Sequence, residues 1–102
     1  MASTGQTYVI MEGVRRAKAH QMAGIATIRA VIQDPAGTCG GEIEVAIDSL
    51  LSPKPAIDLT IPSEPARFCH ILAAVQAGRS LRPITIAPGS RGTIIKDVGF
   101  IQ

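Results

Sequence analysis

The sequence of 102 residues predicts a mainly β domain with a single helix, in the order β-β-β-α-β-β. Three observations predict this class. Two apolar, β-branched runs flank a turn-like stretch at residues 34–41 and match each other in one antiparallel register. A segment at residues 63–78 has helical periodicity with capping residues at both ends. The remaining apolar runs are short and are separated by glycine and proline, which is typical of strands joined by turns.

The hairpin around residues 34–41 is the strongest local signal. Placing Ile28 opposite Val45 aligns the apolar residues of both runs on one face of the pair. The same register places Arg29 opposite Glu44 on the other face, where opposite charges stabilise a cross-strand pair. The match predicts a twisted antiparallel sheet with one covered side.

A first strand is expected over residues 7–14, and Gly13 predicts a bulge or a sharp bend in it. The segment 14–32 has two interpretations. Its apolar residues fall near helical spacing, but a glycine and the β-branched density of the second half favour a strand over 24–32. Residues 15–23 are then expected to form a polar loop or an extension of a strand.

The helix is expected after residues 48–62, which contain three prolines and predict an irregular connection with a short extended piece at 56–61. Ser63 is a suitable N-cap and Gly78 a suitable C-terminal stop. The apolar stripe of this helix is expected to dock on a sheet. It consists of Phe68, Ile71, Leu72 and Val75.

Two more strands are expected, at residues 81–86 and 93–102. Pro83 lacks a backbone donor, which places the first of them at a sheet edge or puts the proline at the strand's start. The element order fits a five-stranded OB-like Greek-key barrel, forming a single domain over residues 7–102 after a flexible N-terminal tail at 1–6. A two-layer α+β sandwich is the alternative.

The composition bounds the core and the compartment. Hydrophobic residues make up 46% of the chain, with only one tyrosine and two phenylalanines, and the mean hydropathy is +0.27. So apolar a small domain is expected to form a homo-oligomer. Cys39 and Cys69 lack metal-ligand spacing and are expected to be free thiols in the cytoplasm. No cofactor, metal or membrane span is predicted.

The net charge of +2 is too small to indicate a partner, but the basic residues are clustered. Arg15, Arg16 and Lys18 fall in the expected first–second loop, and Arg91 falls in the fourth–fifth loop. Two basic loops on one side of a barrel can neutralise a phosphate backbone. With Tyr8 as a stacking surface, these residues predict a non-enzymatic module that binds single-stranded nucleic acid non-specifically.

Two other functions stay open. The basic segment is also typical of a solvated turn, and Glu42 and Glu44 would repel phosphates if their strand faced the ligand. The apolar composition favours a self-associating assembly protein with protein partners. The glycine turn at residues 87–93 allows a small-ligand or catalytic subunit, although no nucleophile motif accompanies it.

Overall fold

The structure is a computed structural model that describes residues 6–102. This part of the chain forms eight strands, two α-helices and two short 3₁₀ helices. In chain order they are β1 (Tyr8–Glu12), α1 (Val14–Met22), β2 (Thr27–Gln33), β3 (Cys39–Ala46), η1 (Ile47–Ser49), β4 (Leu50–Ser52), β5 (Ala56–Asp58), α2 (Glu64–Gln76), β6 (Ile84–Pro88), β7 (Thr93–Ile94), η2 (Ile95–Asp97) and β8 (Gly99–Ile101). The residues of the expected tail that precede Gln6 lie outside the described part.

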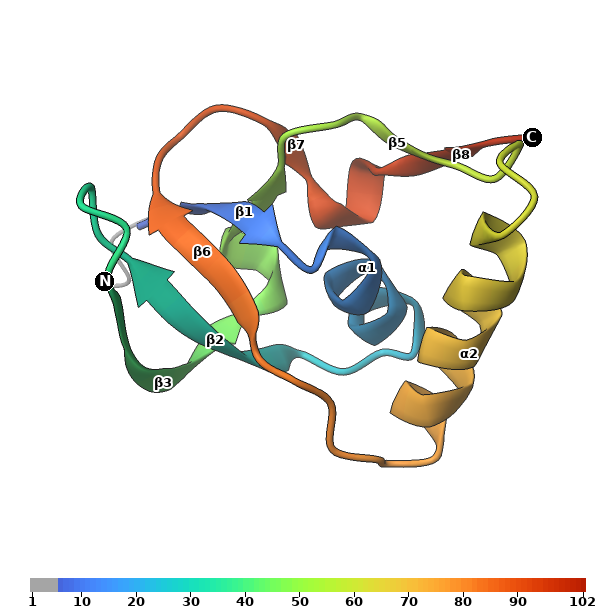
Figure 1. Ribbon diagram of the computed structural model, residues 1–102, viewed down its shortest axis with the longest axis horizontal. Coiled ribbons are helices and arrows are strands. Elements are labelled where there is room, and N and C mark those ends of the chain that lie inside the picture. Colours follow the sequence, from blue (N-terminus) through green and yellow to red (C-terminus); the bar gives the residue numbers. More distant parts are fainter. Residues whose placement is uncertain (1–5) are drawn as a thin grey trace.

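Six strands form one mixed sheet in the order β3-β2-β6-β1-β4-β7, and β5 and β8 form a separate parallel ribbon (Figure 1). Within residues 6–102, no strand pairing joins β3 to β7, so a closed barrel is not observed. The chain is therefore a mixed α/β fold that is mostly sheet, consistent with the α+β alternative. Neither helix in the described part combines the length and the apolar content needed to cross a bilayer.

The predicted hairpin register is confirmed. Strands β2 and β3 pair antiparallel with Ile28 opposite Val45 and Arg29 opposite Glu44. Ile28 and Val45 are both buried, as the apolar face requires. The ion pair, however, runs diagonally, because Arg29 Nη1 lies 3.0 Å from Oε1 of Glu42.

Residues 15–23 are not a polar loop, because most of them belong to helix α1. The turn from β1 into α1 occurs at Gly13, whose φ of 111° is costly for any residue with a Cβ. A Cβ on Gly13 would also lie 2.4 Å from Cγ2 of Ile84. The helix then buries the small side chains Ala17 and Ala19. The buried side of α1 is therefore formed by small alanine side chains and not by the wide apolar stripe from which helices are usually predicted.

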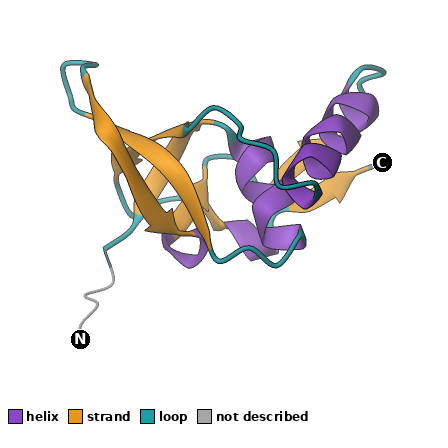
Figure 2. Ribbon diagram, turned by 90° about the horizontal axis from the view of Figure 1, so that it is seen from below, coloured by secondary structure: helices purple, strands orange, loops and turns teal. Residues whose placement is uncertain are grey.

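Helix α1 lies between the large sheet and helix α2 (Figures 1 and 2). Helix α2 has the predicted bounds and stripe, with Phe68 and Val75 buried, but it packs mainly against α1 and the β5–β8 ribbon, and not on the large sheet. The rings of Phe68 and Phe100 meet edge to face at 5.3 Å, which joins α2 to β8. The largest fully buried apolar side chains are Ile10, Leu50, Ile84, Ile86 and Ile95.

In the C-terminal third, one of the two expected positions of Pro83 is confirmed, and the expected last strand is wrong. Strand β6 is central, between β2 and β1, and Pro83 precedes it, so the missing donor falls at the strand's start. The segment 93–102 is not one strand, because η2 interrupts it between β7 and β8. The interruption moves the end of the chain from the large sheet to the ribbon with β5.

Candidate phosphate-binding surface

Lys18, a predicted phosphate contact, lies inside the protein and is only 6% exposed. Its ammonium group donates to Oε1 of Gln21 at 3.0 Å and to the carbonyl oxygens of Ile95 and Lys96 at 3.3 and 3.4 Å. Burial lowers the pKa of Lys18 from its ordinary value, although the charge of Asp97 raises it. In this position Lys18 joins α1 to η2.

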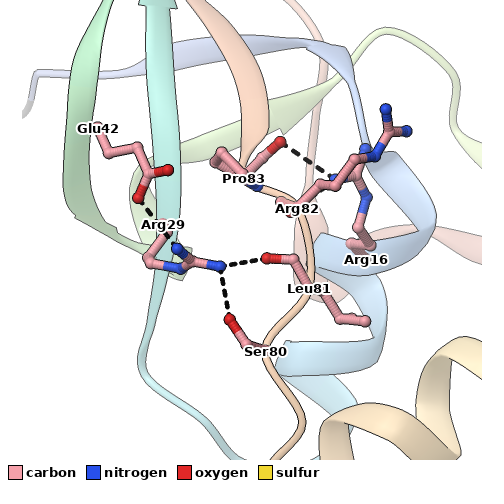
Figure 3. Close-up of polar contacts among 7 residues, drawn as sticks. All are labelled: Arg16, Arg29, Glu42, Ser80, Leu81, Arg82 and Pro83. Atoms are coloured by element: carbon pink, nitrogen blue, oxygen red, sulfur yellow. Dashed lines mark hydrogen bonds and ion pairs between the residues drawn. The ribbon is translucent and has the colours of Figure 1, made fainter.

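Arg15 and Arg16 are also engaged within the fold. Arg15 Nε lies 2.5 Å from the nearly buried carboxylate of Glu64, and this pair joins the two helices. Arg16 Nη1 donates to the carbonyl oxygens of Arg82 at 2.6 Å and Pro83 at 3.1 Å (Figure 3). Arg15 therefore ties α1 to the start of α2, and Arg16 positions the segment that follows α2.

Tyr8 and Arg91 lie on other elements. Tyr8 is half-buried in β1, between β4 and β6, and its side chain packs against the core. Arg91 is exposed in the connection between β6 and β7. The structure thus brings Arg15 and Arg16 together, encloses Lys18, and places Tyr8 and Arg91 apart from the basic hollow described next.

A hollow of about 390 Å³ opens between the start of α1, helix α2 and the 77–83 connection, which links α2 to β6. We call it the arginine hollow, because four arginines and a single glutamate contribute to its wall. Its lining residues are Glu12, Gly13, Arg15, Arg16, Arg67, Ile71 and Arg82.

Like charges are held close together in the arginine hollow. Burial, and then the charge of Arg82, lower the pKa of Arg16, while Glu12 raises it. The nearest approach of Glu12 to Arg16 is 3.9 Å, and the carboxylate is largely exposed, so its compensation is weak. Figure 3 shows the side chains of Arg16 and Arg82 next to each other. An anion between them would relieve the repulsion.

Arg67 and Arg82 are the two arginines of the hollow whose guanidinium groups are not engaged by other described residues. Across residues 6–102, neither guanidinium has a carboxylate within 4.0 Å, and neither donates a side-chain hydrogen bond. A guanidinium presents donors in a planar fork that fits two phosphate oxygens at once. Both residues were absent from the predicted site, because one is on the exposed face of a helix and the other in a connection.

A second hollow of about 230 Å³ lies by the same connection. We call it the serine hollow, after Ser80. Arg29 Nη2 donates to Oγ of Ser80 at 3.0 Å and to the carbonyl oxygen of Leu81, while Nη1 holds Glu42 (Figure 3). The lining residues are His20, Ile25, Thr27, Ile28, Arg29, Glu44, Arg79, Ser80, Leu81 and Arg82.

The remaining chemical groups are the possible metal ligands and the two thiols. In the described part of the chain, no three histidine, cysteine or acidic side chains lie close enough together to hold a metal ion. Cys39 and Cys69 are both exposed free thiols.

A hollow of about 370 Å³ lies beside β1 and β5, and its lining includes the apolar side chains Met11 and Ile61 as well as charged residues. Both side chains are about half exposed, at 57% and 48%. Self-association stays a prediction of the apolar composition.

Comparison with protein families, curated proteins and solved structures returned no match. The function therefore has to be inferred from the geometry of the chain itself.

Proposed function

We propose that this protein binds single-stranded nucleic acid non-specifically, by its phosphate backbone, at the arginine hollow. The observation that carries the proposal is that Arg67 and Arg82 line one hollow with two further arginines, and that neither has a carboxylate partner among residues 6–102. Arg67 and Arg82 are the phosphate contacts. Arg15 and Arg16 fix the walls of the hollow.

The chemistry of the hollow favours a phosphodiester chain over other anions. Guanidinium forks match phosphate oxygens bidentately, and a recess admits a thin chain more readily than the surface of a bilayer. Among the described residues, none of those that line the hollow is aromatic, so no side chain there can stack on a base, and recognition depends on the backbone and not on sequence. An OB-like barrel is not part of this proposal, because the sheet is open among the described strands.

The test is the binding of a fluorescent 15-nucleotide oligothymidylate, followed by anisotropy at 50 and 200 mM salt. Two or three phosphate contacts to a single strand predict a roughly 7- to 20-fold loss of affinity between these salt concentrations. The charge-removing variants Arg67→Gln and Arg82→Gln are each expected to lower the affinity and to flatten the salt dependence.

Two exposed cations outside the hollow supply the matched controls. Arg91→Gln and Lys54→Gln remove the same charge from other connections and are expected to leave the affinity unchanged. Absence of binding at 50 mM salt would overturn the proposal. So would equal losses in the control variants, because the attraction would then come from net charge alone.

A further inference from the structure

We infer that the arginine hollow and the serine hollow form one track that holds two successive phosphates of a single strand across the 77–83 connection. This inference rests on the proposed function. It adds the number of phosphates bound and the path of the nucleic acid across the protein surface. Arg82 belongs to the lining of both hollows, so the two meet at that residue. Arg67 contacts the phosphate on one side and Arg79 the phosphate on the other.

Two arginines hold the 77–83 connection, which the nucleic acid would cross, in place. Arg16 donates to the carbonyl oxygens of Arg82 and Pro83, and Arg29 donates to that of Leu81 (Figure 3). These bonds cover carbonyl oxygens that would otherwise repel a phosphate. They also fix the backbone before the ligand arrives, which lowers the entropy cost of binding.

The serine hollow supplies donors of its own. The hydroxyl oxygen of Ser80 accepts a hydrogen bond from Arg29, which leaves the Ser80 hydroxyl hydrogen free to donate to a phosphate oxygen. Arg79 has no carboxylate within 4.0 Å in the described part of the chain. A neutral donor and an unpaired guanidinium are a sufficient set for one phosphate.

Each hollow also contains one carboxylate, Glu12 in the arginine hollow and Glu44 in the serine hollow. Glu44 accepts a long hydrogen bond of 3.4 Å from Thr27, and Glu12 lies 3.9 Å from Arg16. Neither carboxylate faces Arg67 or Arg79 within ion-pairing distance, in the part of the chain that the structure describes. These two carboxylates lower the net positive charge of each hollow. One hollow alone therefore attracts a phosphate only weakly, and a ligand binds well when it reaches both hollows.

The test compares Arg67→Gln, Arg79→Gln and the double variant with the same oligothymidylate. Each single variant is expected to bind roughly 5- to 10-fold more weakly at 50 mM salt and to lose about 0.7 from the slope of log affinity against log salt. Because the two arginines contact different phosphates, the losses are expected to multiply in the double variant. Arg91→Gln is the control, and circular dichroism verifies that every variant is folded.

Length dependence supplies a second readout. Thymidine 5′-monophosphate can occupy only one hollow, so its affinity is expected to fall far below that of the oligomer. Inorganic polyphosphate, which has successive phosphates and no bases, is expected to compete with the oligomer.

The outcomes separate the two claims. If the oligomer binds and Arg67→Gln weakens it, but Arg79→Gln keeps the affinity and slope of the unchanged protein, the track is wrong and the proposed function stands. Absence of binding by the unchanged protein removes both. If polyglutamate, or vesicles containing phosphatidylserine, compete as well as polyphosphate, the assignment to a phosphodiester strand is overturned.

Discussion

Replacing Gly13 with alanine is expected to lower the free energy of unfolding by about 3 to 5 kcal/mol. The loss has two sources, backbone strain and steric overlap of the new Cβ. The φ of 111° at Gly13 is unfavourable for a residue with a Cβ, and that Cβ would lie 2.4 Å from Cγ2 of Ile84. Because Ile84 is fully buried in β6, it has little room to move away. The measurement is urea unfolding followed by circular dichroism.

Gly24 is the matched control for Gly13. It also has a positive φ, of 77°, but a Cβ added there meets nothing within 4 Å. Gly24→Ala therefore carries only the backbone penalty, about 1 kcal/mol. Equal losses from the two substitutions would contradict the close approach between the β1–α1 turn and the sheet.

The second large effect is expected for Ile84→Ala, at about 2 to 5 kcal/mol. Ile84 is 0% exposed and begins β6, the strand between β2 and β1. Truncation opens a cavity at the place where the sheet meets α1. Urea unfolding measures this loss as well.

The two substitutions are expected to be non-additive. Ile84→Ala removes Cγ2, the atom closest to a Cβ at position 13, although the Cβ of residue 84 remains at 2.9 Å. The double variant is therefore expected to be more stable than the sum of the single losses predicts, by about 1 kcal/mol. Strict additivity would show that the two residues are not in contact.

Local patterns predicted the elements that are determined locally. The β2–β3 register follows from alternation and one opposite-charge pair, and the bounds of α2 follow from its proline-containing first turn and its glycine stop. Both signals lie within about twenty residues of chain. They therefore need no knowledge of the rest of the fold.

Helix α1 could not be predicted in the same way. Its buried residues are two alanines and a lysine, so the helical spacing in this segment gives only a weak apolar stripe, which does not distinguish the helix from a polar loop. Besides Gln21 of the same helix, the partners that accept hydrogen bonds from Lys18 are carbonyl oxygens of η2, nearly eighty residues later in the chain. That contact depends on the interruption of the expected last strand, which nothing near Lys18 indicates.

The residues of the candidate site also divide into those that the local sequence indicates and those that only the fold brings together. Sequence reasoning found the basic segment around Arg15 and Arg16, but the structure shows these arginines bound to Glu64 and to the 77–83 connection. Among the described residues, the arginines of the two hollows that have no side-chain partner come from α2 and from that connection. Arg67 and Arg82 line one hollow because α1 packs against α2 and Arg16 of α1 holds the backbone at Arg82.

The most direct test of phosphate binding at these hollows is a titration with oligothymidylate, followed by the Nε–Hε resonances of the arginine side chains. We expect the resonances of Arg67, Arg79 and Arg82 to shift together with one affinity, while that of Arg91 stays in place. Shifts confined to Arg91, with the other three unchanged, would contradict phosphate binding at the arginine and serine hollows.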